Sequence, residues 1–95
     1  MILFMLKIKS VFVVLNEKGL HTRPSTELVK CASSFKAQIT LHYQQVTVNA
    51  KSLLGILMLA ATRGAKITIE AEGEDAEAAV STILDLARNK FNIKY

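Results

Sequence analysis

Four segments of the chain have the apolar pattern of β-strands. They are residues 7–15, 37–43, 46–49 and 65–71. In the first segment the even-numbered apolar residues are predicted to face the core, while Val11, Val13 and Leu15 would lie on the other face. The second and fourth segments alternate apolar and polar residues, which places His42 on a polar face. Gln44-Gln45 is short enough for a hairpin turn between the second and third strands.

Three further segments repeat apolar residues every three or four positions and are predicted to be amphipathic helices. They are residues 22–35, 52–62 and 76–91. Pro24 belongs in the first turn of the first helix, where its missing N–H has no consequence. The second helix has more apolar residues than one stripe needs, so it is either largely covered or carries an exposed apolar patch, and Gly64 is expected to end it. Asp75 is expected to cap the third helix.

The order of these elements is βαββαβα, which predicts an α+β fold. Helices with apolar stripes and half-buried strands favour a two-layer open-faced sandwich, with three helices on one face of a four-stranded antiparallel sheet. A right-handed split crossover would place the fourth strand between the first and second, giving the order 1-4-2-3. The length of 95 residues fits a single domain, 1–95, in which residues 1–6 form an apolar extension.

The charge is moderately positive, because 12 Lys and Arg stand against 8 Asp and Glu and give a net charge of +4. An acidic protein partner fits this charge, and so does a small basic nucleic-acid-binding module, which is a lower-ranked alternative. Its basic patch would contain Lys18, Arg23, Lys30, Lys51 and Arg63. The aromatic residues do not favour it, because they are scattered at positions expected for a core. They are Phe4, Phe12, Phe35, Tyr43, Phe91 and Tyr95. No nucleic-acid partner is therefore expected.

The single cysteine, Cys31, has no partner within the chain, and an unpaired thiol is typical of a reducing, cytoplasmic location. A metal site would need Cys31, His21 and His42 to converge, but no ligand pair has helical spacing, so no metal or other cofactor is expected. Lys7 and Lys9 interrupt the apolar start of the chain, and neither a signal peptide nor a membrane insertion is predicted.

The most informative stretch is Gly19-Leu20-His21-Thr22-Arg23-Pro24, at the predicted start of the first helix. Imidazole is a good nucleophile near neutral pH, and its phosphorylation gives a phosphoramidate that can pass the phosphoryl group on. The helix N-terminus would supply N–H donors for phosphate, and Arg23 a planar charged fork. Lys18 would add positive charge. Taken alone, a histidine is more often an ordinary polar residue, so the surrounding string decides its interpretation.

That string resembles the active-site signature of the histidine-containing phosphocarrier protein (HPr) family of the bacterial phosphoenolpyruvate-dependent phosphotransferase system. Two other segments are similar to the same family. Residues 49–55, Asn-Ala-Lys-Ser-Leu-Leu-Gly, resemble its regulatory serine segment, and residues 71–75, Ala-Glu-Gly-Glu-Asp, resemble its last turn. The resemblance covers residues 7–91 and agrees with the predicted order of elements.

The resemblance implies that His21 is phosphorylated on Nδ1 by phospho-enzyme I and passes the phosphoryl group to an enzyme IIA component in sugar transport. Arg23 would stabilise the phosphate. Such a protein is a phosphocarrier with a phosphohistidine intermediate rather than a stand-alone enzyme. The run Leu57-Met58-Leu59 also resembles the nitrogen-related branch of the family, which serves regulation rather than sugar uptake. These two branches remain alternatives.

Ser52 has two interpretations. It is placed to cap the second helix, which alone would stabilise that helix by about 1 kcal/mol. The resemblance also implies regulatory phosphorylation of Ser52 by an HPr kinase/phosphorylase. By the same resemblance, partners would dock on Thr22, Leu53, Leu54, Gly55 and Leu57. The protein is expected to act as a cytoplasmic monomer.

Overall fold

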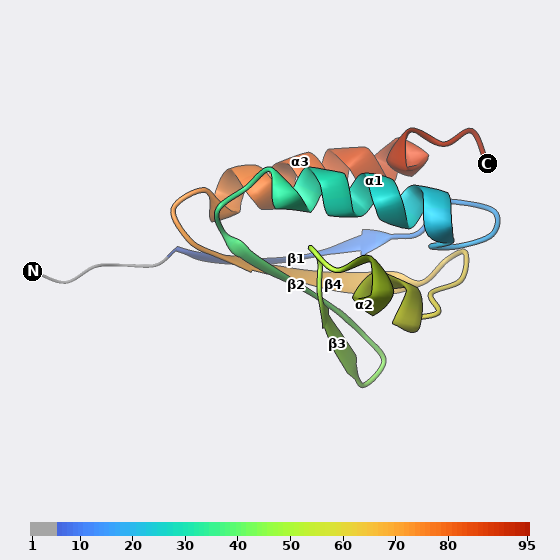
Figure 1. The fold of residues 1–95 in the computed structure, drawn as a ribbon, viewed down its shortest axis with the longest axis horizontal. Helices are drawn as coiled ribbons and strands as arrows, with labels where there is room; N and C mark the ends of the chain where they lie inside the picture. The colour runs from blue at the N-terminus through green and yellow to red at the C-terminus, as the bar shows by residue number, and fades with distance from the viewer. Residues whose placement is uncertain (1–5) are drawn as a thin grey trace, which may run out of the picture.

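The computed structural model describes residues 6–95 and contains four strands, three α-helices and a short 3-10 helix (Figure 1). The strands are β1 (Lys7–Val13), β2 (Gln38–Tyr43), β3 (Val46–Asn49) and β4 (Lys66–Glu72). The helices are α1 (Thr22–Ser33), α2 (Leu53–Met58), α3 (Ala76–Arg88) and the 3-10 helix η1 (Lys90–Asn92). The predicted order βαββαβα is confirmed. Of the expected apolar extension, residues 1–5 lie outside the described residues, and so does the expected core residue Phe4.

The strands form one antiparallel sheet in the predicted order β1-β4-β2-β3. The central strand β4 pairs with β1 along its whole length, from Lys7 opposite Glu72 to Val13 opposite Lys66. On its other side it pairs with β2, and β2 pairs with β3 through a hairpin. Gln44, in the hairpin turn, has a positive φ of 46°. Both β1 and β3 are therefore edge strands.

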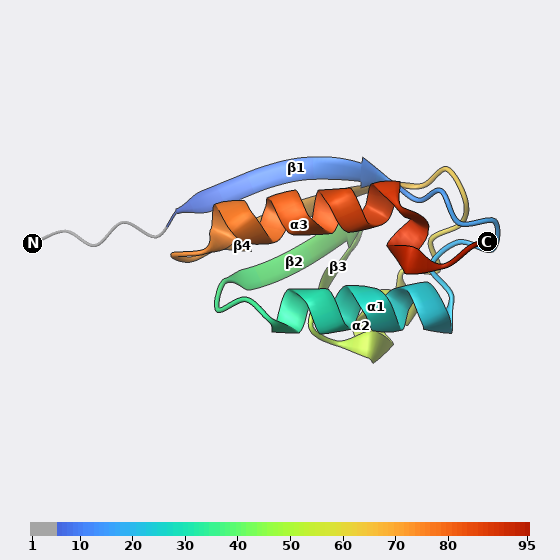
Figure 2. The same ribbon diagram turned by 90° about the horizontal axis from the view of Figure 1, so that it is seen from above.

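Alternate residues of the sheet face the helices. In β4, Ile67, Ile69 and Ala71 are fully buried, while the residues between them are half-buried. The helices α1 and α3 lie side by side along this face (Figures 1 and 2), and α2 packs against α1 and β3. The result is the predicted two-layer open-faced sandwich, with the core between the sheet and the two long helices.

The first strand ends two residues earlier than predicted, at Val13. Val14 still exchanges two hydrogen bonds with the chain before β4, since its N–H donates to the Ala65 carbonyl at 2.9 Å and its carbonyl accepts from the Gly64 N–H at 2.8 Å. The predicted alternation continues through this pairing. Phe12 and Val14 are buried, whereas the apolar side chains at 11, 13 and 15 are exposed.

The second helix is much shorter than predicted and ends at Met58 rather than at residue 62. Ala60 has a positive φ of 50°, a conformation that cannot continue a right-handed helix. The expected ending at Gly64 is therefore wrong. Gly64 also has a positive φ, 89°, but it lies in a separate turn before β4. The chain leaves α2 early because the following segment, around Ala61, pairs with the loop before α1.

The other two helices also end before the last apolar residue of their pattern. The helix α1 stops at Ser33, and Phe35 packs beyond it, half-buried against the core. The helix α3 stops at Arg88, whereas Phe91 lies in η1 with a positive φ of 55°. The Phe91 ring is fully buried and meets Phe12 edge to face, with centroids 6.0 Å apart. Apolar spacing alone therefore overestimated the lengths of both helices.

Asp75 precedes α3 but does not cap it with its side chain, contrary to the prediction. Its carboxylate instead accepts the backbone N–H groups of Lys36 and Ala37, each over 2.8 Å. These bonds, that from Lys36 first, lower the pKa of the Asp75 carboxyl below its usual value. Asp75 therefore connects the start of α3 to the loop between α1 and β2.

Candidate functional site

The loop that leads into α1 is held against the segment that follows α2. Gly19 has a positive φ of 72°, and a Cβ built on it would come within 2.2 Å of the Ala61 carbonyl oxygen. The next residue, Leu20, is buried and donates its N–H to that same oxygen over 3.0 Å. Glycine is therefore needed at position 19 both for its backbone conformation and for the close approach. These contacts fix the backbone immediately before His21.

His21 is the N-cap residue of α1, and its carbonyl accepts the Ser25 N–H at 2.9 Å. Its side chain is exposed and makes no capping hydrogen bond. Pro24 lies in the first turn, as predicted, and has no N–H to donate. Thr22 and Arg23 therefore contribute the first-turn N–H groups that lack an intrahelical acceptor. The imidazole thus makes no capping hydrogen bond to its own helix and belongs to the residue at the helix N-terminus, where the peptide dipoles place positive charge.

One cavity of about 230 Å³ is lined by three of the predicted site residues, His21, Thr22 and Arg23. Its complete lining is Lys18, Gly19, His21, Thr22, Arg23, Pro24 and Tyr95. Two cationic side chains and no carboxylate side chain line it. Charge and the helix end therefore both favour an anion beside the imidazole.

Tyr95 belongs to this site, although its sequence position gave no indication of it. The expectation that it is a core residue is wrong, because 46% of its surface is exposed. Its hydroxyl accepts a hydrogen bond of 2.8 Å from Nη1 of Arg23. The guanidinium carbon lies 5.9 Å from the ring centroid. The guanidinium therefore has both a hydrogen bond to the hydroxyl and a cation–π contact with the ring of Tyr95.

Two buried polar side chains hold the loop before His21 in place through hydrogen bonds, and neither was recognised from the sequence. Asn16 donates through Nδ2 to the main-chain oxygens of Lys90 and Tyr95, at 2.9 and 3.1 Å. Its own Oδ1 is buried and has no hydrogen-bond partner among the described residues. Ser25 is fully buried, and its hydroxyl donates to the Leu20 carbonyl at 3.0 Å. In the sequence, Asn16 looked like an ordinary turn residue.

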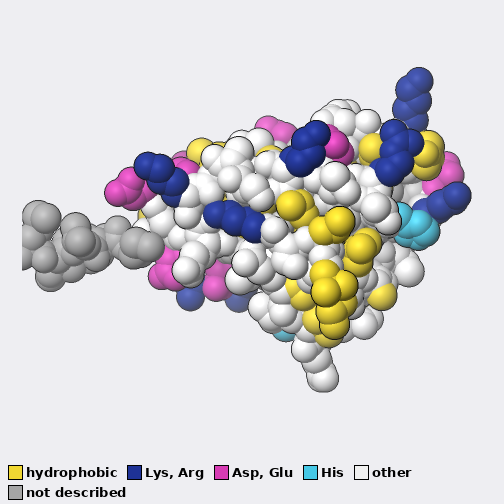
Figure 3. Space-filling view, viewed as in Figure 1, with side chains coloured by type: hydrophobic (Ala, Val, Ile, Leu, Met, Phe, Trp, Pro, Cys, Tyr) yellow, Lys and Arg dark blue, Asp and Glu magenta, His cyan; other side chains and the backbone are white. Residues whose placement is uncertain are grey.

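The predicted docking residues of α2 form a second, apolar surface. Leu54 and Met58 expose 69% and 66% of their surfaces, whereas Ile56 between them is fully buried. Leu53, Gly55 and Leu57 are half-buried. Figure 3 shows these hydrophobic side chains gathered over α2, on the face that also carries the N-terminal end of α1. Met58 joins the predicted docking residues on this surface, although it was not assigned to it from the sequence.

Ser52 begins α2 and caps it as predicted, because its Oγ accepts the Gly55 N–H at 3.1 Å. Neither Ser52 nor the α2 docking residues line the His21 cavity. The two surfaces are nevertheless joined, since α2 packs directly against α1. The site thus has a polar, cationic part at His21 and an apolar part on α2.

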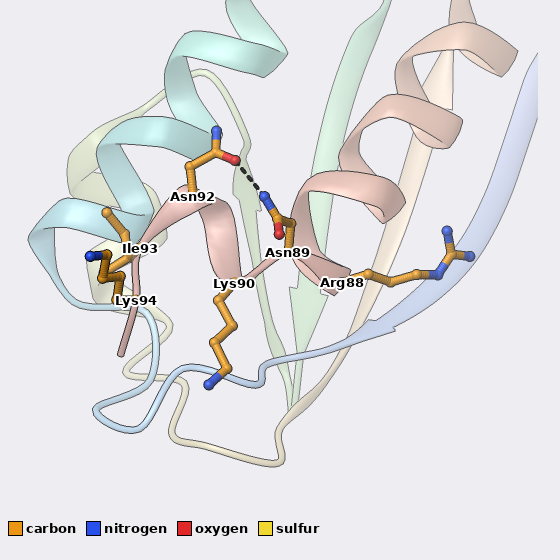
Figure 4. Close-up of a pocket in the computed structure, with 6 residues that line it drawn as sticks. All are labelled: Arg88, Asn89, Lys90, Asn92, Ile93 and Lys94. Atoms are coloured by element: carbon orange, nitrogen blue, oxygen red, sulfur yellow. Dashed lines mark hydrogen bonds between the residues drawn. The ribbon is translucent and has the colours of Figure 1, made fainter.

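A larger hollow of about 410 Å³ lies at the end of α3 (Figure 4). It is lined by Arg88, Asn89, Lys90, Asn92, Ile93 and Lys94. Its cationic side chains do not converge, because Arg88 points toward β1 while Lys94 points to the other side. Arg88 is also paired with the carboxylate of Asp85. This hollow therefore lacks the convergent donors that an anion site needs.

Residues 6–95 contain no group of three His, Cys, Asp or Glu side chains placed to hold a metal ion. His42 lies on the open face of the sheet, where its Nδ1 and Thr47 Oγ1 are 2.6 Å apart. Cys31 is half-buried in α1, and burial raises the pKa of its thiol. No helix in the described part of the chain is long and apolar enough to cross a membrane.

The phosphate-compatible histidine site can be compared with known families. The family model described as "PTS HPr component phosphorylation site" matches residues 8–89, which is most of the chain. The chain belongs to the HPr family. It is thus related to the phosphocarrier proteins of the phosphotransferase system, as the sequence resemblance implied.

Individual HPr proteins agree with this assignment. The phosphocarrier protein HPr of Xylella fastidiosa (strain 9a5c) is 39% identical over 80 residues, which are 84% of this chain and 90% of that protein. The crystal structure of HPr-C-His from Thermoanaerobacter tengcongensis is similar with a TM-score of 0.88 and 35% identity, covering 93% of this chain and 99% of the other. HPr from Bacillus anthracis str. Ames gives a TM-score of 0.80 at 38% identity, covering 83% and 94%.

Proposed function

We propose that this HPr-family protein carries a phosphoryl group on His21, which it receives from phospho-enzyme I and passes to an enzyme IIA component during sugar uptake. One observation carries the proposal. The exposed His21 lies at the N-terminus of α1, and it lines one cavity together with the cationic Lys18 and Arg23. A nucleophile and a set of anion donors therefore meet at one accessible point.

The phosphoryl transfer needs no reactant besides the two proteins. A lone pair on the neutral His21 imidazole attacks phosphorus, and the bond between phosphorus and the donor's histidine nitrogen breaks as the new nitrogen–phosphorus bond forms. The donor's phosphoimidazole carries a proton on its other ring nitrogen, so the electron pair of the broken bond leaves it as neutral imidazole, while phosphorylated His21 keeps its own ring N–H. Arg23 and the helix N–H groups hold the oxygens of the transferred group while it moves. The second transfer, to the acceptor, repeats these steps with His21 as the donor.

Exposure is what allows His21 to serve two partners in turn. We infer that each partner binds the apolar surface of α2, which includes Leu54 and Met58, because α2 packs against α1, the helix that His21 caps. The run Leu57-Met58-Leu59, of which Met58 is exposed, keeps the nitrogen-related branch as a second candidate. In that case the acceptor is a regulatory enzyme IIA instead of one that serves a sugar transporter.

Regulation at Ser52 is a further part of the proposal. Its Oγ accepts the Gly55 N–H, so the hydroxyl hydrogen remains available for replacement by a phosphoryl group from an HPr kinase/phosphorylase. The added negative charge would lie at the edge of the docking surface and oppose an acidic partner. We further infer that the protein works as a cytoplasmic monomer, in keeping with its reduced Cys31. Size-exclusion chromatography with light scattering measures the oligomeric state.

The test of the central proposal uses enzyme I and labelled phosphoenolpyruvate. The wild-type protein should gain a label that is stable in alkali and lost in acid, and His21→Ala should gain none. The matched control is His42→Ala, which removes the other histidine, also exposed but on the open face of the sheet. Label that persists in His21→Ala and disappears in His42→Ala would overturn the assignment. Separate purified enzyme IIA proteins for sugars and for nitrogen regulation then identify the acceptor.

A further inference from the structure

Arg23 is tethered rather than free. Its side chain is exposed, yet Nη1 donates to the Tyr95 hydroxyl over 2.8 Å, and both residues line the His21 cavity. An exposed arginine normally samples many rotamers, and the loss of this rotamer entropy opposes its fixation. A side chain already held at the rim of the cavity loses less of this freedom when it binds phosphate.

Tyr95 can act as a tether because its own main chain is fixed. Asn16, which is fully buried, donates from its amide nitrogen to the main-chain oxygens of both Tyr95 and Lys90. Asn16 belongs to the loop that leads to His21. The tyrosine and the histidine are thus attached to the same loop, one through a side-chain amide and the other through the chain itself.

The group that holds Arg23 is uncharged. A phenol hydroxyl is neutral, so it orients the guanidinium without cancelling its positive charge, as a carboxylate would. The bond also uses only one of the five N–H donors of the guanidinium, and the rest remain available for phosphate oxygens.

We propose that Tyr95 is a positioning residue for phosphoryl transfer, which holds Arg23 in place beside His21 through its hydroxyl. This inference rests on the proposed function and adds a residue to its site. Tyr95 acts through Arg23, so its effect should exist only while Arg23 is present.

The experiment compares wild type, Tyr95→Phe, Arg23→Ala and the double variant. Tyr95→Phe keeps the ring and removes only the hydroxyl, and Tyr43→Phe is the matched control on β2. Phosphorylation by a fixed concentration of enzyme I is followed at several concentrations of each variant, so that kcat and KM are separated. Each protein is also phosphorylated chemically with potassium phosphoramidate and followed by ³¹P NMR. In that reaction the bond from phosphorus to ammonia breaks while the bond to imidazole forms, and no protein partner is needed.

Tyr95→Phe should lower kcat for transfer by about threefold to tenfold with little change in KM, and Tyr43→Phe should change neither. In the Arg23→Ala background, Tyr95→Phe should have no further effect. A rate for Tyr95→Phe equal to or above that of wild type would overturn the inference. An equal slowing with and without Arg23 would also overturn it, since Tyr95 would then act structurally. Failure of wild type to accept label from enzyme I rejects the proposed function instead, while the phosphoramidate rates still test the tether.

Discussion

Gly19 lies so close to Ala61 that a Cβ on the glycine would stand 2.2 Å from the alanine carbonyl oxygen. This contact joins the loop before His21 to the segment after α2. The loop that carries His21 is therefore in direct contact with the segment that leaves α2, the helix on which we propose that partners dock. Substitutions at this contact should affect both stability and phosphoryl transfer.

Gly19→Ala should lower the free energy of unfolding by about 2 to 4 kcal/mol, because it adds a steric clash to a strained positive φ. Gly64→Ala is a matched control, since Gly64 also has a positive φ but a Cβ there would meet nothing within 4 Å. It should lose only about 1 kcal/mol. Urea unfolding measures both. Equal losses for the two variants would show that the contact with Ala61 contributes nothing.

Asp75 should make stability depend on pH in the acid range. Its carboxyl has a lowered pKa in the folded protein, chiefly through the Lys36 N–H, so its contribution is complete above the unfolded pKa of about 4 and is lost as pH falls through the lower folded value. Thermal unfolding of wild type and Asp75→Asn should therefore differ most at neutral pH, and the difference should shrink on acidification below about pH 4. Asp85→Asn, which alters an exposed ion pair with Arg88, is the control. A pH-independent difference for Asp75→Asn contradicts the assignment.

The exposed side chain of Leu54 should matter for binding and little for folding. Leu54→Asp is expected to change stability by no more than about 0.5 kcal/mol, because 69% of the side chain is exposed. Its affinity for enzyme I should fall by about tenfold or more, since an acid replaces an apolar contact. The control is Val11→Asp, which places the same charge on β1, the edge strand at the other side of the sheet from β3. Its side chain is 52% exposed. Isothermal titration calorimetry that shows equal affinities for both variants would exclude α2 as the docking surface.

Ser52 allows capping and regulation to be separated. Ser52→Ala removes the cap and should lower stability by about 1 kcal/mol, whereas Ser52→Asp keeps an acceptor for the Gly55 N–H and should stay near wild type. Only Ser52→Asp adds negative charge, so only it should weaken loading by enzyme I. Phosphorylation by an HPr kinase/phosphorylase should be lost in Ser52→Ala and kept in the control Ser34→Ala, at the end of α1. Equal loading of the Ala and Asp variants would argue against regulation by charge.

Local patterns predicted the strands and the existence of three helices, because alternation and helical spacing directly reflect which face is buried. The strand order followed from the right-handedness of the crossover. Local patterns failed where a distant contact decides the local structure. The second helix ends at Met58 because the residues around Ala61 pair with the loop before α1. Similarly, Asp75 faces a loop 38 residues away instead of its own helix. Neither contact has a signature in the nearby sequence.

The candidate site shows the same division. The string from Gly19 to Pro24 identified the histidine and its cation, since nucleophile, charge and helix start are adjacent in sequence. Tyr95 and Asn16 could not be found in this way. Their hydrogen bonds span 72 and 79 residues, and tyrosine and asparagine are common in surface and turn positions. Only folding brings Tyr95 next to Arg23 of the first helix.

The strand order also has a consequence for biosynthesis. The central strand β4 is the last of the four to leave the ribosome, and it must enter between β1 and β2, which are already synthesised. Until then β1 has no partner in the sheet, and only the β2–β3 hairpin can form from contacts that are close in sequence. Nascent chains that end before Lys66 should therefore expose the apolar faces of β1 and α1 and depend on chaperones until β4 closes the sheet.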